Sequence, residues 1–279
     1  MIEVTNLSKN YGSRVAVSDL SFTVEDGQIY GFLGPNGAGK STTMNILTGC
    51  LAATSGRVLI DGKDVFEDAQ EAKAKIGYLP EQPPLFLDMT PKEYLSFVAA
   101  AKKTKKEERK ALIEEVMEIT KIKSEENRLI KNLSKGYRQR VGIAQAILGN
   151  PSIVILDEPT VGLDPLQIIE IRSLIKKLGE NHTVILSSHI LSEVQAVCDK
   201  IMIISEGRLA ACDTPSNLEA LFEGENTLEL TVRAGADEVN TALSSIEEIK
   251  SVKLTPKDNE ITEAEITVSR DADITEKVF

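Results

Sequence analysis

The stretch GPNGAGKST, Gly34 to Thr42, decides the fold of this chain. It fits the phosphate-binding pattern G-x-x-x-x-G-K-[ST], and it lies between two apolar runs, QIYGFL before it and TTMNIL after it. In this strand–loop–helix setting the glycines let successive backbone N–H groups point at phosphate oxygens, and the following helix adds its positive N-terminal end. The stretch therefore predicts a nucleoside-triphosphate site. A glycine-rich turn that happens to contain Lys-Ser is the weaker alternative.

Individual positions of this loop have different predicted tasks. Lys40 places a point charge on the β- and γ-phosphates, and Ser41 offers a hydroxyl to Mg²⁺. Tyr11, in a predicted turn before the loop, is predicted to stack on the base, although a lone loop aromatic is usually a packing residue. The predicted nucleotide contacts are Tyr11, Asn36, Gly37, Ala38, Gly39, Lys40, Ser41 and Thr42.

Composition narrows the remaining possibilities. The 279 residues, 42% of them hydrophobic, suffice for one large domain or two smaller ones. A net charge of −11 argues against a nucleic-acid binder, because phosphate contacts call for a basic face. No apolar run approaches the ~18–20 residues of a membrane helix, and the N-terminus lacks the layout of a signal peptide. The three widely spaced cysteines are interpreted as reduced thiols of a cytoplasmic protein.

The order of predicted elements indicates an α/β core. Alternating apolar and polar residues over 1–25 predict an antiparallel sheet, and residues from about 85 to 150 have the character of a helical insertion. Within that insertion, the basic run at 102–110 is interpreted as a solvated helix face rather than as a phosphate or headgroup patch. Predicted strands then alternate with helices, which is typical of a parallel sheet wrapped by helices. Those strands are 153–157, 183–187 and 200–204.

A pair of carboxylates follows the first of these strands. Asp157 and Glu158 come directly after the apolar run IVIL, in the position where a P-loop protein carries its magnesium-binding acid. The acidic pair therefore predicts the metal partner of the phosphate loop, with a structural cap as the minority interpretation.

Together these motifs resemble the ATP-binding cassette (ABC) ATPase family over residues 1 to about 220. The residues of these motifs are most similar to those in the cassettes of bacterial export-type transporters, in which the membrane subunit is a separate chain. The motifs occur in the family's order: an aromatic loop at Tyr11, Walker A at 34–42, a glutamine-type loop at Glu81-Gln82, the signature LSKGY at 133–137, Walker B at 153–158, GLD at 162–164 and a switch histidine at His189.

The resemblance implies a role for each matching residue. Asp157 would hold Mg²⁺ through water, Glu158 would act as general base on the attacking water, and His189 would contact the γ-phosphate. Ser134 and Gly136, at the head of a helix, would close over the γ-phosphate bound to a second copy of the chain. Asp164 would lie across that dimer interface, whereas His182 matches no motif and is assigned no role.

Two departures from the family pattern affect the predicted site. Lys135 and Tyr137 stand where the signature usually has a glycine and a glutamine. Glu81 aligns with the loop glutamine, and Gln82 follows one position later, so either side chain would reach Mg²⁺ with an oxygen.

The resemblance implies a P-loop NTPase core with an antiparallel β subdomain and a helical subdomain. It also implies an ATP-hydrolysing subunit of a transporter, expected to be an exporter, with ATP and Mg²⁺ as cofactors. The expected partners are a second copy of the chain, as a head-to-tail homodimer, and an integral membrane permease. We expect no nucleic acid, and a location on the inner face of the cell membrane through the permease. The alternatives are a soluble ABC-type ATPase and a nucleotide-regulated binding module without turnover.

Residues 221–279 are predicted to form a separate small α+β unit. Its pattern of strand, helix, strand, strand and helix corresponds to most of a ferredoxin-like βαββαβ unit. Because the last predicted helix begins at Asp273, close to Phe279, we interpret the unit as truncated. The predicted elements before that helix are 227–233, 237–246, 250–255 and 260–269.

Overall fold

The computed structural model describes residues 1–222, 226–244, 246, 249–257 and 261–268. The chain divides into two compact units, residues 1–215 and 216–279. Each unit has a hydrophobic core of its own.

The first unit is built on a six-stranded sheet of order β10-β9-β3-β8-β7-β6, in which β10 pairs antiparallel at the edge and the other neighbours are parallel. Every residue of β7 and β8 is buried, as expected for parallel strands covered on both faces. Since parallel strands end at the same edge, the segments that follow β3, β7 and β8 meet there. The strands are β3 (Ile29–Leu33), β6 (Ile76–Leu79), β7 (Ile153–Leu156), β8 (Thr183–Ser188), β9 (Lys200–Ser205) and β10 (Arg208–Asp213).

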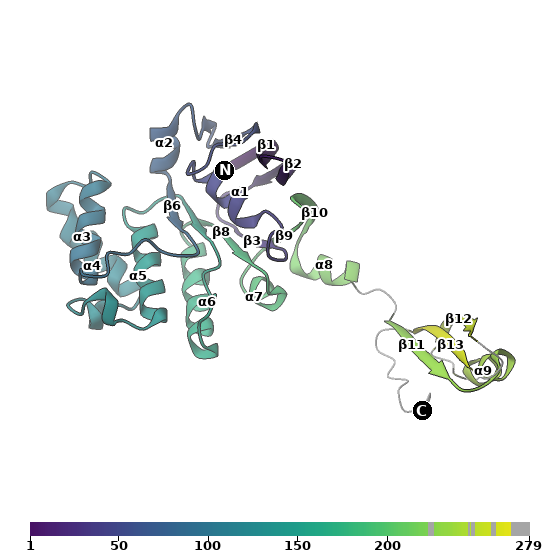
Figure 1. Cartoon of the computed structure of the whole chain (residues 1–279). Coiled ribbons are helices and arrows are strands. Elements are labelled where there is room, and N and C mark those ends of the chain that lie inside the picture. The colour runs from purple at the N-terminus through teal and green to yellow at the C-terminus, as the bar shows by residue number, and fades with distance from the viewer. Residues whose placement is uncertain (223–225, 245, 247–248, 258–260, 269–279) are drawn as a thin grey trace. The chain divides into compact units, whose positions relative to one another are not determined.

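An antiparallel sheet of order β2-β1-β4-β5 accompanies the parallel one. Helix α1 (Lys40–Leu47) lies beside both sheets (Figure 1). It shares a core with them, because Met44, Ile46 and Leu47 lie in one buried cluster with side chains of β1, β2, β3 and β7. The phosphate loop is thereby fixed at both of its ends. The strands of this sheet are β1 (Ile2–Tyr11), β2 (Arg14–Val24), β4 (Ser55–Ile60) and β5 (Lys63–Asp64).

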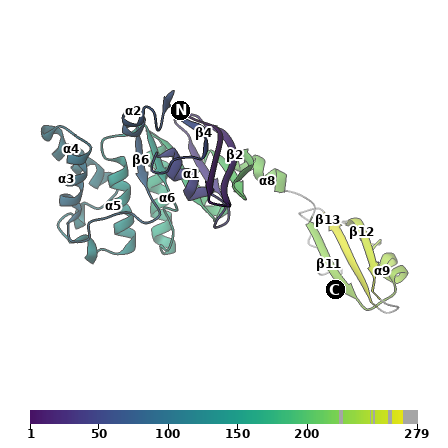
Figure 2. The same cartoon turned by 45° about the horizontal axis from the view of Figure 1, so that its top comes forward.

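The expected helical insertion consists of α3 (Pro91–Ala101), α4 (Lys106–Ile119) and α5 (Lys135–Ile147), with short 3₁₀ turns between α4 and α5. Figures 1 and 2 show these three helices grouped at the end of the first unit that lies away from β1 and β2. Helix α3 begins with a capping box, in which the Thr90 hydroxyl and the Glu93 carboxylate each accept a hydrogen bond from the other's backbone N–H. The remaining helices of the unit are α2 (Ala69–Ala74), α6 (Pro165–Gly179) and α7 (Leu191–Gln195), while α8 (Pro215–Phe222) begins at the boundary.

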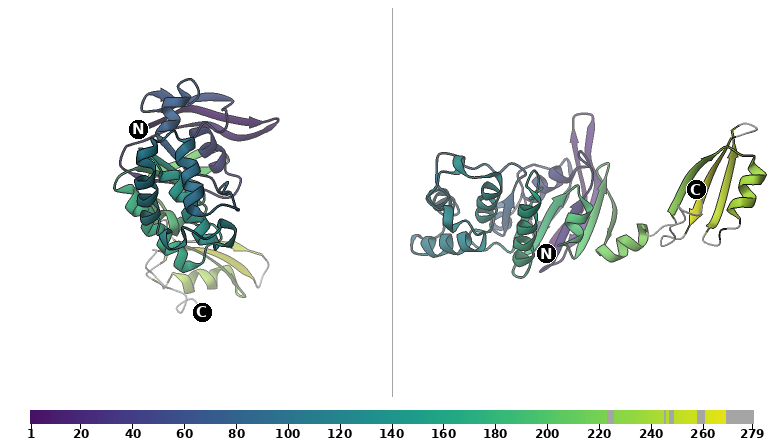
Figure 3. Two further views of the ribbon diagram at one scale, coloured as in Figure 1. Left: turned by 90° about the vertical axis from the view of Figure 1, so that its left-hand side faces the viewer. Right: turned by 90° about the horizontal axis from the view of Figure 1, so that it is seen from below.

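The second unit contains β11 (Asn226–Val232), α9 (Ala236–Leu243), β12 (Ile249–Pro256) and β13 (Thr262–Val268). Strand β13 lies between β11 and β12 and is antiparallel to both, which is the strand order of a ferredoxin-like unit. Helix α9 covers one face of this sheet (Figure 3, right). Its Val239 and Leu243 pack there in a cluster that includes Ile266. The helix predicted from Asp273 lies outside the described residues.

The P-loop core, the antiparallel sheet and the helical insertion agree with the fold class expected from the sequence. Three elements were not predicted: α2, β10 and α8. Helix α2 has six residues, of which only Ala72 is buried, so it shows no apolar period. Strand β10 contains no fully buried residue, so its sequence lacks the apolar pattern of a core strand.

We expect Thr90→Ala to lower the free energy of unfolding by about 1 kcal/mol, because the first turn of α3 loses its side-chain cap. Urea unfolding of the full chain measures this. Thr104→Ala is the matched control, since the Thr104 hydroxyl makes no hydrogen bond within the described residues, and it should change the stability by less than about 0.5 kcal/mol. Equal effects of the two substitutions would contradict the capping role.

Candidate functional site

The loop between β3 and α1 curls around the side chain of Lys40. The Lys40 Nζ donates hydrogen bonds to the carbonyl oxygens of Gly34, at 2.8 Å, and Pro35, at 3.3 Å. The ammonium group is therefore held inside the curve of its own loop, with only 6% of the residue exposed.

Two glycines of this loop are required by close backbone contacts. A Cβ atom at Gly34 would lie 2.3 Å from the carbonyl oxygen of Ile204 in β9. Gly39 has a φ of +105°, and a Cβ there would lie 2.5 Å from the carbonyl oxygen of Ala16 in β2. Any larger residue would push the loop away from the two strands that enclose it.

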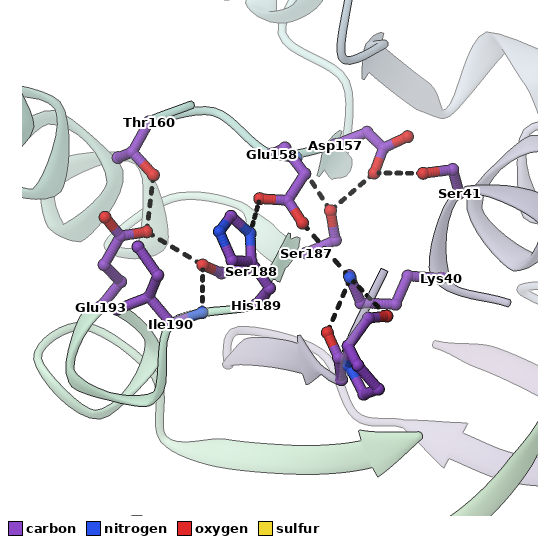
Figure 4. Close-up of polar contacts among 12 residues, drawn as sticks. Lys40, Ser41, Asp157, Glu158, Thr160, Ser187, Ser188, His189, Ile190 and Glu193 are labelled. Carbon is purple, nitrogen blue, oxygen red and sulfur yellow. Dashed lines mark hydrogen bonds and ion pairs between the residues drawn. The ribbon is translucent and has the colours of Figure 1, made fainter. Parts of the chain in front are cut away.

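The end of β7 places two carboxylates beside the loop. The Ser41 hydroxyl donates to Asp157 Oδ1 at 3.2 Å, and Lys40 Nζ lies 3.3 Å from Glu158 Oε1 (Figure 4). Since both partners of the second contact are buried, Lys40 and Glu158 form an ion pair that is shielded from solvent.

Ser187, the penultimate residue of β8, forms hydrogen bonds with both acidic residues. Its hydroxyl donates to Asp157 Oδ1 at 2.6 Å and accepts from the backbone N–H of Glu158 at 2.8 Å. This bond helps to hold Glu158 in a left-handed conformation, with φ of +48°, that non-glycine residues rarely adopt. Burial raises the pKa of the Asp157 carboxyl, and hydrogen bonds from Ser187 and Ser41 oppose that rise.

The oxygen donors at this point suit Mg²⁺. Asp157 forms no ion pair with another side chain of the described chain, its burial disfavours an unpaired charge, and the Ser41 hydroxyl faces it. Hard carboxylate and hydroxyl oxygens are the ligands that Mg²⁺ accepts, usually few from the protein and the rest from water and phosphate.

His189 follows β8 directly and completes the group. Its Nδ1 lies 3.0 Å from Glu158 Oε2, so the Glu158 carboxylate sits between an ammonium and an imidazole. His182, which was assigned no role, is buried with its Nδ1 2.7 Å from the carbonyl oxygen of Pro151, and it does not line the pocket described next.

Lys40, Ser41, Glu158 and His189 line a pocket of about 480 Å³, a size typical of small-molecule sites. Tyr11 lies at its wall with half of its surface exposed, and Lys9 Nζ lies 5.3 Å from the centre of the Tyr11 ring. The lining residues are Tyr11, Arg14, Ala16, Asn36, Gly37, Gly39, Lys40, Ser41, Thr42, Glu81, Glu158, Val161 and His189.

Three of the lining residues, Arg14, Ala16 and Val161, were missed by sequence reasoning. Arg14 begins β2, directly after the two-residue turn that follows Tyr11, and its positive charge close to the predicted stacking residue was the one signal available in the sequence. Conversely, two residues of the predicted site do not line the pocket. Ala38, predicted to contact the nucleotide, and Asp157, predicted to contact Mg²⁺, are both buried.

The structure also separates the two candidates in the glutamine-type loop. Glu81 lines the pocket, whereas Gln82 does not. Both line a neighbouring cavity of about 320 Å³, which shares Glu81 and Val161 with the first one.

The signature residues lie elsewhere on the first unit. Ser134 caps α5 by accepting from the backbone N–H of Tyr137, and Asp164 caps α6 by accepting from that of Gln167. Ser134, Gly136 and Tyr137 line a different cavity, of about 210 Å³, where Gly136 packs against the Gln167 side chain.

Lys135 is exposed, and the end of its side chain lies against the backbone of Gly162. Neither the signature residues nor Asp164 line the pocket of the phosphate loop. Within one chain, the two groups of predicted site residues are therefore not brought together.

The sequence model of the family described as ABC transporter matches residues 17–161. The chain is 43% identical over 211 residues to the bacitracin transport ATP-binding protein BcrA of Bacillus licheniformis, covering 75% of this chain and 68% of that protein. It is 36% identical over 233 residues to the lantibiotic transport ATP-binding protein SrtF of Streptococcus pyogenes, covering 82% of this chain and 99% of that protein.

Solved structures give the same picture. An ATP-binding subunit of an ABC transporter superposes with a TM-score of 0.71 at 29% identity, over 80% of this chain and 93% of that chain. A dimeric ATP-binding cassette in a post-hydrolysis state, bound to ADP and Pi, superposes with a TM-score of 0.70 at 27% identity, over 77% of this chain and 99% of that chain. Within the described residues, no helix has both the length and the apolar character needed to cross a membrane.

We expect Asp157→Asn to raise the melting temperature of the nucleotide-free chain by a few degrees at neutral pH. Because folding raises the pKa of this aspartate, its ionised form costs stability above that pKa, and a neutral amide removes the cost. Thermal unfolding followed by circular dichroism measures the shift.

Asp88→Asn is the matched control for this substitution. The Asp88 side chain is 90% exposed, so neutralising it relieves no burial of charge and should give no rise in melting temperature. A lower melting temperature in Asp157→Asn would show instead that the Ser41 and Ser187 hydrogen bonds outweigh the burial.

Proposed function

The chain belongs to the ABC transporter family as an ATP-binding, ATP-hydrolysing subunit, and we propose that it powers export through a separate membrane subunit. The observation that carries the catalytic part is the position of Glu158, between Lys40 and His189 at the wall of the phosphate-loop pocket. General-base catalysis needs a proton acceptor within hydrogen-bond reach of the attacking water, and the Glu158 carboxylate would be that acceptor.

In the proposed reaction, the backbone N–H groups of the loop from Asn36 to Thr42 and the Lys40 ammonium hold the phosphates. When ATP binds, the Lys40 ammonium would leave its ion pair with Glu158 and bind phosphate oxygens instead. The Glu158 carboxylate would then be free to accept a proton from the attacking water. His189, at 3.0 Å from Glu158, would orient that carboxylate and contact the γ-phosphate. Tyr11 would stack on the base.

Ser41 and Asp157 would hold Mg²⁺, Asp157 through water, and the ion would supply positive charge at the β- and γ-phosphates. For the third protein contact we propose Glu81 over Gln82. The support for this choice is that Glu81 lines the pocket and Gln82 does not.

Two copies of the chain would complete the sites. Ser134, Lys135, Gly136 and Tyr137 of one copy would close over the nucleotide held by the other, with Asp164 across the interface. This proposal is supported by the separation of the signature from the pocket of its own chain, and by the dimeric state of the similar cassette.

The membrane partner would be an integral permease subunit, which places the chain on the cytoplasmic face of the membrane. The loop 81–87 and the helical insertion would contact it, because Phe86, Leu87 and Phe97 are large apolar side chains exposed there. BcrA and SrtF are named as transport ATP-binding proteins, which favours the transport role. We assign ATP hydrolysis to residues 1–220 and an accessory role to 221–279.

We expect Glu158→Gln to lower the steady-state rate of phosphate release by about 10²–10⁴-fold, because the amide cannot accept the proton of water. ATP binding should stay within a few-fold of the wild type, whereas Lys40→Ala should weaken it. Glu180→Gln, the same change on an exposed residue, is the control and should leave turnover intact. Normal turnover in Glu158→Gln would contradict the general-base role.

A further inference from the structure

Glu193 is a buried carboxylate that the proposed mechanism does not use. It lies on α7 with 5% of its surface exposed, and no lysine, arginine or histidine of the described chain pairs with it. Its Oε2 atom accepts two hydrogen bonds, from Thr160 Oγ1 at 2.6 Å and from Ser188 Oγ at 2.9 Å (Figure 4). A buried carboxylate is costly unless hydroxyl donors of this kind satisfy it, so the arrangement calls for an explanation.

The two donors flank the two catalytic residues. Thr160 comes two residues after Glu158, and Ser188 comes directly before His189. The Ser188 hydroxyl also accepts from the backbone N–H of Ile190 at 3.1 Å, so it holds the chain on the other side of His189 as well. A single carboxylate oxygen thus joins the segment that carries the base to the segment that carries the histidine.

This link adds to the one that Ser187 makes. The Ser187 hydroxyl accepts a hydrogen bond from the backbone N–H of Glu158. Two residues later in the chain, Thr160 is held by its hydrogen bond to Glu193. Glu158 adopts its unfavourable φ of +48° between these two anchors. Through Glu193, helix α7 is hydrogen-bonded both to Thr160, after β7, and to Ser188, at the end of β8.

We propose that Glu193 is a positioning residue, which sets the geometry of Glu158 against His189 by tying Thr160 and Ser188 to one carboxylate oxygen. The proposal rests on the roles proposed above for Glu158 and His189. A carboxylate at this place would maintain the 3.0 Å contact between Glu158 and His189, whereas other residues, those of the phosphate loop, would bind the nucleotide.

The test compares Thr160→Val, Glu193→Ala and the double variant in the full chain. Thr160→Val should lower kcat for ATP hydrolysis by about 10–10²-fold, the loss expected when a catalytic group moves by about 1 Å, and nucleotide affinity should stay within about twofold. Thr160→Ser, which keeps the hydroxyl, should restore kcat. In the Glu193→Ala background, Thr160→Val should cause no further loss, because its partner is already absent.

Thr120→Val is the matched control. The Thr120 hydroxyl is also buried and also donates a 2.6 Å bond, to the carbonyl oxygen of Val116 within α4, far from either catalytic residue in the sequence. It should lower the melting temperature to an extent similar to Thr160→Val and leave kcat within about twofold. If Glu193→Ala does not fold, Thr160→Val and Thr160→Ser still decide the matter.

A wild-type kcat in Thr160→Val, or additive losses in the double variant, would overturn the positioning role. Measuring Glu158→Gln alongside separates the two levels of the proposal. If Glu158→Gln is inactive while Thr160→Val turns over normally, only the role of Glu193 fails. If Glu158→Gln itself turns over normally, the general-base role fails and the positioning role falls with it.

Discussion

The buried ion pair between Lys40 and Glu158 is the interaction on which the rest of the first unit depends. An ammonium and a carboxylate removed from water are tolerated only when they stay paired and hydrogen-bonded. The glycine-bearing loop and the end of β7 must therefore meet at one point of the sheet edge, where His189 brings in the end of β8. Phosphate oxygens are the natural replacement for Glu158 as partner of the lysine. In the proposed mechanism, this contact would connect nucleotide entry to release of the proposed base.

The same edge of the sheet contains two features that lower the stability of the fold. Asp157 is buried with a raised pKa, and Glu158 has a left-handed backbone. Both are maintained because β7 and β8 are wholly buried and their ends are held by Ser187 and Ser188. Strain and buried charge of this kind concentrate at functional sites, where the surrounding core imposes a geometry that the local chain would not choose.

The sequence predicted the phosphate loop and the acidic pair because each is a local pattern at the end of an apolar strand. The switch histidine was predicted only through the resemblance to the ABC family. The order of strands and helices followed from hydrophobic periodicity, and three elements were missed by it: the short helices α2 and α8 and the unburied strand β10. The Glu193 network could not be predicted in this way. It depends on the hydroxyl groups of Thr160 and Ser188, which are 28 positions apart in the sequence. The two residues come together only when β7 and β8 pair. Periodicity carries no information on such contacts, nor on which of Glu81 and Gln82 faces the pocket.

The central claim is that two copies of the chain share each nucleotide, since the signature lies apart from the pocket of its own chain. Light scattering of the Glu158→Gln protein, with and without ATP and Mg²⁺, tests it most directly because this variant should bind ATP without consuming it. The account predicts a monomer without nucleotide, a dimer with ATP, and a monomer again with ADP. A protein that is saturated with ATP and stays monomeric would contradict the shared site.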